Sequence, residues 1–277
     1  MSAAFGARLV DAVAARGSLC VGIDPHPGLL ADWGLPADAS GLERFALTCV
    51  EALAGEVSVL KPQSAFFEAY GSKGIAVLER VIAESQAAGA LVLLDVKRGD
   101  IGSTMAAYAA AYLTDGSPLA ADAVTVSPFL GFGSLTPVLD AAERGGRGVF
   151  VLALTSNPEG ASVQRAMGAD GRLVAQAVVD ESAARNAGAH PLGSVGIVVG
   201  ATLRETGVDL SALNGPILAP GVGAQGADAD DLVRLFGPSL PHVLPTSSRD
   251  VLRHGPDTAA VRSAALRLRD RLAVAAR

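Results

Sequence analysis

Eight short apolar runs recur along the chain, and a longer segment with helical character follows each of them. The runs lie at 19–24, 57–62, 91–97, 123–127, 148–154, 195–200, 216–220 and 242–246. Because their apolar content is nearly continuous, we expect parallel strands that are covered on both faces. Between them, 74–88 carries an apolar stripe that stops before Gly89, a typical end of a helix. Helices are also predicted at 103–113, with Ser103 as N-cap, and at 257–274.

Eight strands alternating with helices fit either an open doubly wound sheet or a closed barrel. The first strand lacks the Gly-x-Gly-x-x-Gly turn of dinucleotide-binding sheets, which disfavours the open sheet. The length of 277 residues is close to the roughly 250 that are typical of a (β/α)8 barrel. We therefore predict an α/β protein with a (β/α)8 TIM-barrel fold, formed by 1–277 as a single domain. Within it, 155–171 is predicted to be a mobile loop on the active face.

Composition narrows the range of partners and compartments. The net charge of −6 and an aromatic content of 4% disfavour binding to nucleic acid or to an anionic membrane surface. There is no apolar run of ~18 residues and no basic-then-apolar segment at the N-terminus, so we expect a cytoplasmic protein. The two cysteines, Cys20 and Cys49, lie in apolar surroundings and are expected to be buried, reduced thiols.

Titratable residues stand where the predicted strands end, which is where barrel enzymes place their chemistry. In LLDVKRGDIGST (93–104), Asp95 and Lys97 are two positions apart and therefore point to the same face, toward the mouth of the barrel. Gly99 permits a tight turn that brings Asp100 back toward them. A buried ion pair stabilises a fold only weakly because of its desolvation cost, so a functional interpretation is favoured over a structural one.

The neighbouring charges indicate the role of Lys97. A lysine becomes a Schiff-base nucleophile when desolvation or a second cation favours the neutral amine, whereas Asp95 and Asp100 favour the ammonium form. We therefore expect Lys97 to stay protonated and to donate a proton. Lys61, at the end of the second strand, completes an alternating Lys–Asp–Lys–Asp set that has no net charge and would crowd any substrate anion pushed against Asp95.

A phosphate site is predicted at the end of the last two strands. The seventh strand runs into APGVGAQG (219–226), a Gly-rich turn before a helix that begins near Asp228. The eighth runs into PTSSRDV (245–251), in which Arg249 follows two hydroxyl side chains. Loops after strands seven and eight hold phosphate in many barrels through backbone N–H groups, a helix N-terminus and an arginine.

These motifs together resemble the orotidine 5′-monophosphate decarboxylase family, in its longer bacterial branch. The resemblance covers nearly the whole chain, through VGIDPHP (21–27), LKPQSAFFEAYGSKG (60–74), LLDVKRGDIGST (93–104), TVSPFLGFGSL (125–135), TSNPEG (155–160), APGVGAQG (219–226) and TSSRDV (246–251). It implies a barrel that converts orotidine 5′-monophosphate to uridine 5′-monophosphate in de novo pyrimidine biosynthesis. It also implies that the reaction needs no cofactor and no metal.

The resemblance assigns roles to matching residues at the reacting end of the substrate. Asp24 would bind the ribose, and Ser127 would read the edge of the pyrimidine. Asp95 would crowd the leaving carboxylate, while Lys97 would stabilise and protonate the carbanion at C6. Lys61 would complete the charged network.

The resemblance also implies contacts at the phosphate end of the substrate and contacts with a partner subunit. Arg249 would hold the phosphate, Gln225 would bridge base and phosphate loops, and further substrate contacts would come from Pro220, Gly221, Gly223 and Ser248. Asp100, Ile101 and Thr104 would reach into the site of a partner subunit, which implies a homodimer with shared sites. The chain departs from many relatives in having Ser248 where they have glycine, and Asp250 places an acid beside the bound anion.

Two other functions compete with this one. A sister-barrel decarboxylase or aldolase acting on a sugar phosphate would need Mg²⁺ held by carboxylates, and Lys61 stands where such relatives carry an acid. A phosphate-binding barrel without catalytic activity is the second alternative, although it would have no use for Asp95 beside Lys97.

Overall fold

Eight parallel strands form a closed barrel in which each strand pairs with the next and β8 pairs with β1. The computed structural model describes residues 3–223 and 226–275. The strands are β1 (Cys20–Ile23), β2 (Val59–Pro62), β3 (Leu91–Arg98), β4 (Ala123–Val126), β5 (Gly148–Leu154), β6 (Val195–Val199), β7 (Ile217–Pro220) and β8 (Val243–Ser247). Each lies within two residues, at either end, of the apolar run that predicted it, and the (β/α)8 fold is confirmed.

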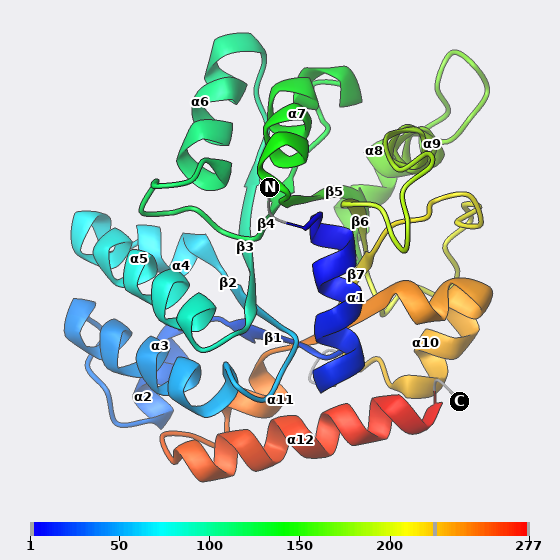
Figure 1. The fold of residues 1–277 in the computed structure, drawn as a ribbon. Helices are drawn as coiled ribbons and strands as arrows, with labels where there is room; N and C mark the ends of the chain where they lie inside the picture. Colours follow the sequence, from blue (N-terminus) through cyan, green and yellow to red (C-terminus); the bar gives the residue numbers. More distant parts are fainter. Residues whose placement is uncertain (1–2, 224–225, 276–277) are drawn as a thin grey trace.

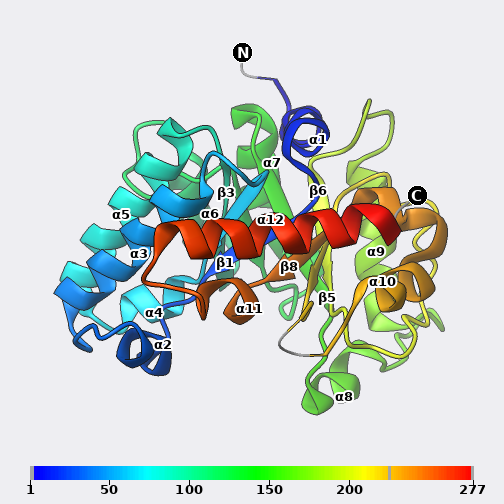
Figure 2. The ribbon, with the colours of Figure 1, turned by 90° about the horizontal axis from the view of Figure 1, so that it is seen from below.

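Helices surround this barrel (Figure 1). They are α1 (Phe5–Arg16), α2 (Pro27–Asp32), α3 (Ala39–Leu53), α4 (Ser64–Glu68), α5 (Gly71–Ala87), α6 (Gly102–Leu113), α7 (Thr136–Gly145), α8 (Ala161–Gln164), α9 (Val174–Arg185), α10 (Ala229–Phe236), α11 (Arg249–Leu252) and α12 (Thr258–Ala275). The last of them, α12, runs along the outside between α3 and α10 (Figure 2). Three short 3-10 helices span Phe132–Leu135, Pro158–Gly160 and Gly237–His242.

The helix predictions hold with one correction at a helix start. Gly89 follows the end of α5 with a φ of +92°, as expected for a stop signal. Ser103 is not the N-cap of α6, because the helix begins at Gly102 and Ile101 occupies the cap position without a side-chain hydrogen bond. Because the turn after β3 is tight, α6 begins at Gly102, one residue before the predicted start at 103.

Side chains alternate between the barrel interior and the surrounding helices, which sets the position of the site. The interior is filled from the amino-terminal side by an apolar cluster that includes Cys20, Val59, Leu91, Leu93, Ala123, Phe150, Val198, Leu218 and Leu244. Outward residues such as Val92, Leu94 and Val96 join the larger cluster beneath the helices. Because the side-chain period of a strand is two, the next inward positions on β2, β3, β4 and β8 after these apolar layers are 61, 95, 125 and 246. All four carry polar or charged residues.

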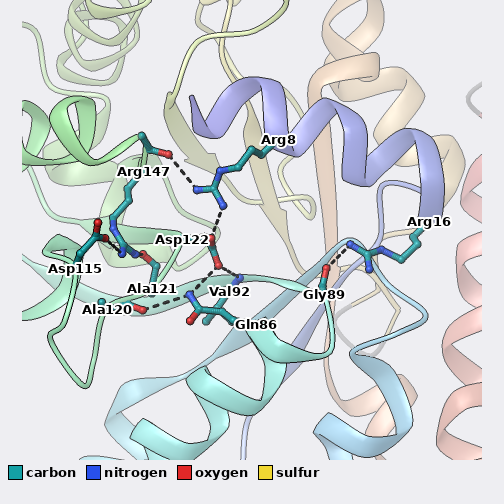
Figure 3. Close-up of polar contacts among 11 residues, drawn as sticks. Arg8, Arg16, Gln86, Gly89, Val92, Asp115, Ala120, Ala121, Asp122 and Arg147 are labelled. Carbon is teal, nitrogen blue, oxygen red and sulfur yellow. Dashed lines mark hydrogen bonds and ion pairs between the residues drawn. The ribbon is translucent and has the colours of Figure 1, made fainter. Parts of the chain in front are cut away.

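Helix α1 closes the amino-terminal end of the barrel, opposite those polar positions (Figure 1). Its Phe5 ring meets the Phe150 ring inside the barrel edge to face, with centroids 6.0 Å apart. Arg8 forms an ion pair with Asp122 at 2.5 Å, and the second carboxylate oxygen of Asp122 accepts the Val92 N–H at 2.9 Å (Figure 3). This end is therefore sealed by packing and hydrogen bonds, and the open end of the barrel is the one formed by the carboxyl ends of the strands.

Three further predictions can be compared with the structure. Cys20 and Cys49 are buried free thiols, as expected, and burial raises the pKa of Cys20 to about 12. Within residues 3–223 and 226–275, no helix is both long and apolar enough to span a bilayer. The segment 155–171 contains α8, and the Gln164 side chain bonds both the Thr155 N–H (2.9 Å) and the Thr155 hydroxyl (2.7 Å). That this segment moves stays a prediction.

Candidate active site

A buried carboxylate between two ammonium groups occupies the barrel mouth. Asp95 on β3 accepts a hydrogen bond from Lys61 Nζ of β2 at 2.9 Å and one from Lys97 Nζ at 2.6 Å. The Asp95 and Lys61 side chains are 8% and 7% exposed, whereas that of Lys97 is 45% exposed. Lys97 is therefore the most exposed member of the cluster.

Charge pairing controls the ionisation of the two buried members. Burial by itself would raise the pKa of Asp95, but the ammonium groups of Lys61 and Lys97 outweigh it and hold that pKa well below its usual value. Burial would likewise lower the pKa of Lys61, but the carboxylates of Asp95 and Asp24 raise it above its usual value. At neutral pH the site therefore holds a fixed anion flanked by cations.

Thr125 of β4 belongs to the same cluster, and the sequence analysis missed it. Its hydroxyl donates to Asp95 Oδ1 at 2.8 Å and accepts the backbone N–H of Lys97 at 3.0 Å. A signal was available, because Thr125 is the polar residue that follows Ala123 at the next inward position of β4. Asp95 thus accepts three hydrogen bonds, which fix the direction of its carboxylate.

The backbone of β3 is irregular where it carries Lys97. Between Leu94 and Arg98 the strand advances four positions, while its partner β4 advances only two, from Val124 to Val126. Lys97 has a φ of +45°, in the left-handed region that non-glycine residues rarely adopt. This bulge lets Lys97 turn its ammonium group back to Asp95 from the last part of the strand.

Gly99 permits the tight turn after this bulge, for a steric reason. A Cβ on Gly99 would lie 2.5 Å from the backbone oxygen of Ser127 at the end of β4. The Ser127 N–H in turn donates to the backbone oxygen of Arg98 at 2.8 Å. The ends of β3 and β4 can therefore approach this closely only with glycine at position 99.

A cavity of about 290 Å³ opens beside the cluster and reaches the predicted phosphate loops. The residues that line it lie at the ends of β1, β2, β7 and β8 or just after them: Asp24, His26, Lys61, Pro220, Gly221, Val222, Thr246, Ser248 and Arg249. Six of these, all except His26, Val222 and Thr246, are among the predicted site residues. One cavity thus connects the buried charges with the two loops that carry Gly221 and Arg249.

Polar groups at this cavity are available to a ligand. Asp24 Oδ1 and Ser248 Oγ are buried, and they have no hydrogen-bond partner within residues 3–223 and 226–275. Arg249 begins α11, is exposed, and makes no side-chain hydrogen bond or ion pair to any described residue. Buried polar atoms are normally paired, so groups of this kind at a cavity mark a place where a polar ligand can bind.

The Asp250 carboxylate turns away from this cavity. It lies against Gly223, where a Cβ would come within 2.1 Å of Asp250 Oδ2, and Gly223 has a φ of +82°. Its other oxygen lies 3.5 Å from Arg253 Nη2. Arg249 lines the cavity and Asp250 does not; that Asp250 places an acid beside a bound anion stays a prediction. Gln225 lies outside the described residues.

Four predicted residues near the ends of β3 and β4 do not line the cavity, and neither do Asp95, Lys97 and Gly223. The Asp100 carboxylate accepts the Ile101 N–H at 2.8 Å and makes no ion pair with Lys97 in the described part of this chain. Ile101 is 62% exposed, and Thr104 is exposed on α6. Ser127 is half-buried at the end of β4. These four cluster around the β3 and β4 ends, on the rim next to Lys97.

His26 and Thr246 are cavity residues that the sequence analysis did not single out. The His26 ring lies 4.3 Å from the Phe66 ring, between centroids, which places it over the entrance from the β1 side. Both residues fall inside motifs quoted for the family resemblance, and Thr246 occupies an inward position of β8. Across the described residues, no group of three or more His, Cys, Asp or Glu side chains is arranged to hold a metal ion.

A closed barrel with charged strand ends and Gly- and Arg-bearing loops after β7 and β8 is the architecture of the (β/α)8 enzymes, many of which bind phosphate at those loops. The model of the orotidine 5′-phosphate decarboxylase / HUMPS family matches residues 17–264. The chain is a member of that family, which confirms the resemblance seen in the motifs.

Relatives match over nearly their whole length. An orotidine 5′-phosphate decarboxylase of Salinispora arenicola is 68% identical over 264 residues, which is 95% of each chain. One of Streptomyces coelicolor is 60% identical and covers 98% of this chain and 96% of its own. Among solved structures, an orotidine 5′-phosphate decarboxylase candidate from Streptomyces avermitilis is 59% identical with a TM-score of 0.96, covering 99% of this chain and 96% of that one.

Proposed function

We propose that the protein is a carboxy-lyase that converts orotidine 5′-monophosphate to uridine 5′-monophosphate without a cofactor, in de novo pyrimidine biosynthesis. The observation that carries this proposal is the Lys61–Asp95–Lys97 cluster, whose Lys61 lines the same cavity as Gly221 and Arg249. Membership of the decarboxylase family supports the same reaction. The activity is assigned to 1–277 as one barrel domain.

The charges account for the chemistry at C6 of the pyrimidine. Asp95 stays ionised, so a substrate carboxylate held beside it is destabilised relative to neutral carbon dioxide. The bond between C6 and the carboxyl carbon breaks, carbon dioxide leaves, and the electron pair remains on C6. Lys97 stabilises this carbanion and donates a proton from Nζ to form the C6–H bond. The neutral amine then regains a proton from solvent, which its 45% exposure allows.

Binding of the distant phosphate orients the base against the cluster. Arg249, Ser248 and the backbone around Gly221 and Gly223 are assigned to the phosphate at the β7–β8 side, together with Pro220; all of these except Gly223 line the cavity. Asp24 is assigned to the ribose hydroxyls, because its buried Oδ1 faces the cavity without a protein partner. Binding energy gained at the phosphate is used at the reacting carbon.

A homodimer with shared sites is part of the proposal. Ile101, Phe129 and Leu130, at the ends of β3 and β4, are 62%, 76% and 53% exposed. Large apolar side chains gathered on one rim favour contact with another protein surface. Asp100 lies on this rim rather than beside Lys97 of its own chain, so it is assigned, with Ile101 and Thr104, to the site of the partner. Ser127 is assigned to the pyrimidine edge.

The deciding experiment is the loss of substrate absorbance when purified protein meets orotidine 5′-monophosphate. We expect turnover that a Lys97→Ala variant lacks. Binding of the nucleotide without turnover by the unmodified protein would instead identify a phosphate-binding barrel with no catalytic activity. Turnover that appears only with added Mg²⁺ would favour the sister-barrel reaction.

A further inference from the structure

Arg98 follows Lys97 directly and makes an unusual number of contacts for a residue at a strand end. Its Nη2 forms an ion pair with Glu68 of α4 at 2.6 Å, and its Nη1 donates to the backbone oxygen of Val96 at 3.3 Å. Its Nε lies 3.4 Å from the Tyr112 hydroxyl, and the guanidinium lies 5.6 Å from the centroid of the Tyr108 ring, both on α6. One side chain thus ties β3 to the helices on both of its sides.

The contact to Val96 lies within the bulge that carries Lys97. Val96 and Arg98 flank Lys97, so the Arg98–Val96 bond closes a loop around the one residue of β3 that has a positive φ. A non-glycine residue in that conformation is strained and persists only where its surroundings hold it. The Lys97 N–H bond to Thr125 holds the bulge from the inside of the barrel, and Arg98 holds it from the outside.

Glu68 gives Arg98 a fixed partner. Its Oε1 also accepts the Ser64 hydroxyl at 2.6 Å, within the short helix that begins two residues after β2. Gln63, which precedes that helix, bridges to Asp95 in the backbone ladder and lies 3.4 Å from Lys61 Nζ. The Glu68–Arg98 pair therefore connects the segment after Lys61 to the segment that carries Lys97.

We propose that Arg98 and Glu68 are positioning residues that hold the β3 bulge and so aim the Lys97 ammonium group at Asp95 and C6. The inference deepens the proposed function and rests on it. Neither residue touches the cavity, so neither is proposed to contact the substrate. A guanidinium is suited to this role because its planar fork presents separate N–H groups in fixed directions to the Val96 oxygen and to Glu68, whereas the donors of a lysine sit on one atom at the end of a flexible stem.

The test compares Arg98→Ala, Arg98→Lys and Glu68→Gln with a matched surface variant, Arg185→Ala. Arg185 pairs with Asp140 at 2.8 Å, with side chains 33% and 40% exposed, close to the 29% and 36% of Arg98 and Glu68. Turnover of orotidine 5′-monophosphate by the unmodified protein is measured first, which separates failure of the proposed function from failure of this inference. Melting temperatures show which variants fold.

We expect Arg98→Ala to lower kcat by about tenfold to a hundredfold, because misplacing a reacting group by about 1 Å costs about a hundredfold. Its KM should stay within about threefold, since the phosphate loops are untouched. Arg98→Lys and Glu68→Gln should retain more activity than Arg98→Ala, and Arg185→Ala should match the unmodified protein.

A binding experiment separates positioning from general loosening. Uridine 5′-monophosphate and an analogue of it with an anionic oxygen at C6 are titrated into each variant. If Lys97 is misdirected, the affinity for the analogue with the C6 oxygen falls by the same factor as kcat. The affinity for uridine 5′-monophosphate stays unchanged. The inference is overturned if Arg98→Ala loses affinity equally for both ligands, or if its kcat stays within twofold of that of the unmodified protein. If Arg98→Ala does not fold, Arg98→Lys and Glu68→Gln decide by the same criteria.

Discussion

Asp95→Asn isolates the charge that compensates Lys61, because asparagine has nearly the same size as aspartate. The Lys61 and Asp95 side chains are 7% and 8% exposed, with Nζ and Oδ2 2.9 Å apart. Removing one partner of a buried ion pair costs about 3–5 kcal/mol of unfolding free energy, because the other charge stays buried without compensation. Asp24, which also raises the pKa of Lys61, remains in the variant and places the expected loss toward the lower value. At about 2–4 °C for each kcal/mol, the melting temperature should fall by about 6–12 °C.

The dependence on pH gives a second signature. In the unmodified protein the folded-state pKa of Lys61 is raised above its unfolded-state pKa. The stability that Lys61 contributes is therefore fully present below the unfolded-state pKa and is lost as pH rises through the folded-state pKa. The folded-state pKa of Asp95 is lowered, so its contribution is present above the unfolded-state value of about 3.9 and is lost as pH falls through the folded-state pKa. Between about pH 5 and pH 9 the pair therefore does not make the free energy of unfolding depend on pH.

Asp95→Asn changes the sign of the shift at Lys61. Burial, the largest influence on that pKa, lowers it, and the main carboxylate that opposes burial is gone. The unfolded chain then binds more protons than the folded one, so the stability of the variant should rise with pH from 7 to 9, relative to that of the unmodified protein.

Urea unfolding followed by circular dichroism at pH 7 and pH 9, at one protein concentration, measures both effects. Asp140→Asn is the control, because it removes an acid from an ion pair with Arg185 whose side chains are 33% and 40% exposed. That change should cost about 0–1 kcal/mol at either pH. If Asp95→Asn is as stable as Asp140→Asn and shows the same pH dependence, the reasoning about an uncompensated buried ammonium is refuted.

Four further predictions concern activity. Lys97→Ala should fold normally and lose about 100-fold or more in turnover, and retention of more than a few per cent in the steady-state assay would rule out a proton-donor role. Dialysis against EDTA should leave the rate unchanged, whereas loss of activity with recovery on adding Mg²⁺ would favour the enediolate chemistry of a sister barrel. Arg249→Ala should lower kcat/KM heavily for orotidine 5′-monophosphate and little for the nucleoside orotidine, and equal losses on both substrates would make Arg249 structural. Mixing inactive Lys97→Ala and Asp100→Ala proteins should restore activity to about a quarter of normal as subunits exchange, and no recovery despite exchange verified by mass would assign Asp100 to its own chain's site.

Local patterns along the chain were sufficient to determine the strands and the orientation of several site residues. Nearly continuous apolar runs located every strand to within two residues, because burial on both faces leaves little freedom in composition. The two-residue spacing of Asp95 and Lys97 predicted that both face the mouth, where one now bonds the other at 2.6 Å. The spacing predicted the side of the sheet for Asp95, whereas the contact of Lys97 with it also depends on the bulge in β3.

Only the tertiary structure decided how the strand ends meet. The partnership of Thr125 with Asp95, the bulge that gives Lys97 a positive φ, and the contact of Asp250 with Gly223 all join residues from different strands or loops. A one-residue change in the register of β4 would turn Thr125 to the opposite face. Register and bulges arise from the closing of the whole barrel, in which each strand is placed by its neighbours on both sides. A pattern read along one strand carries no information about that closure, and the same physical reason made Ser103 a wrong N-cap.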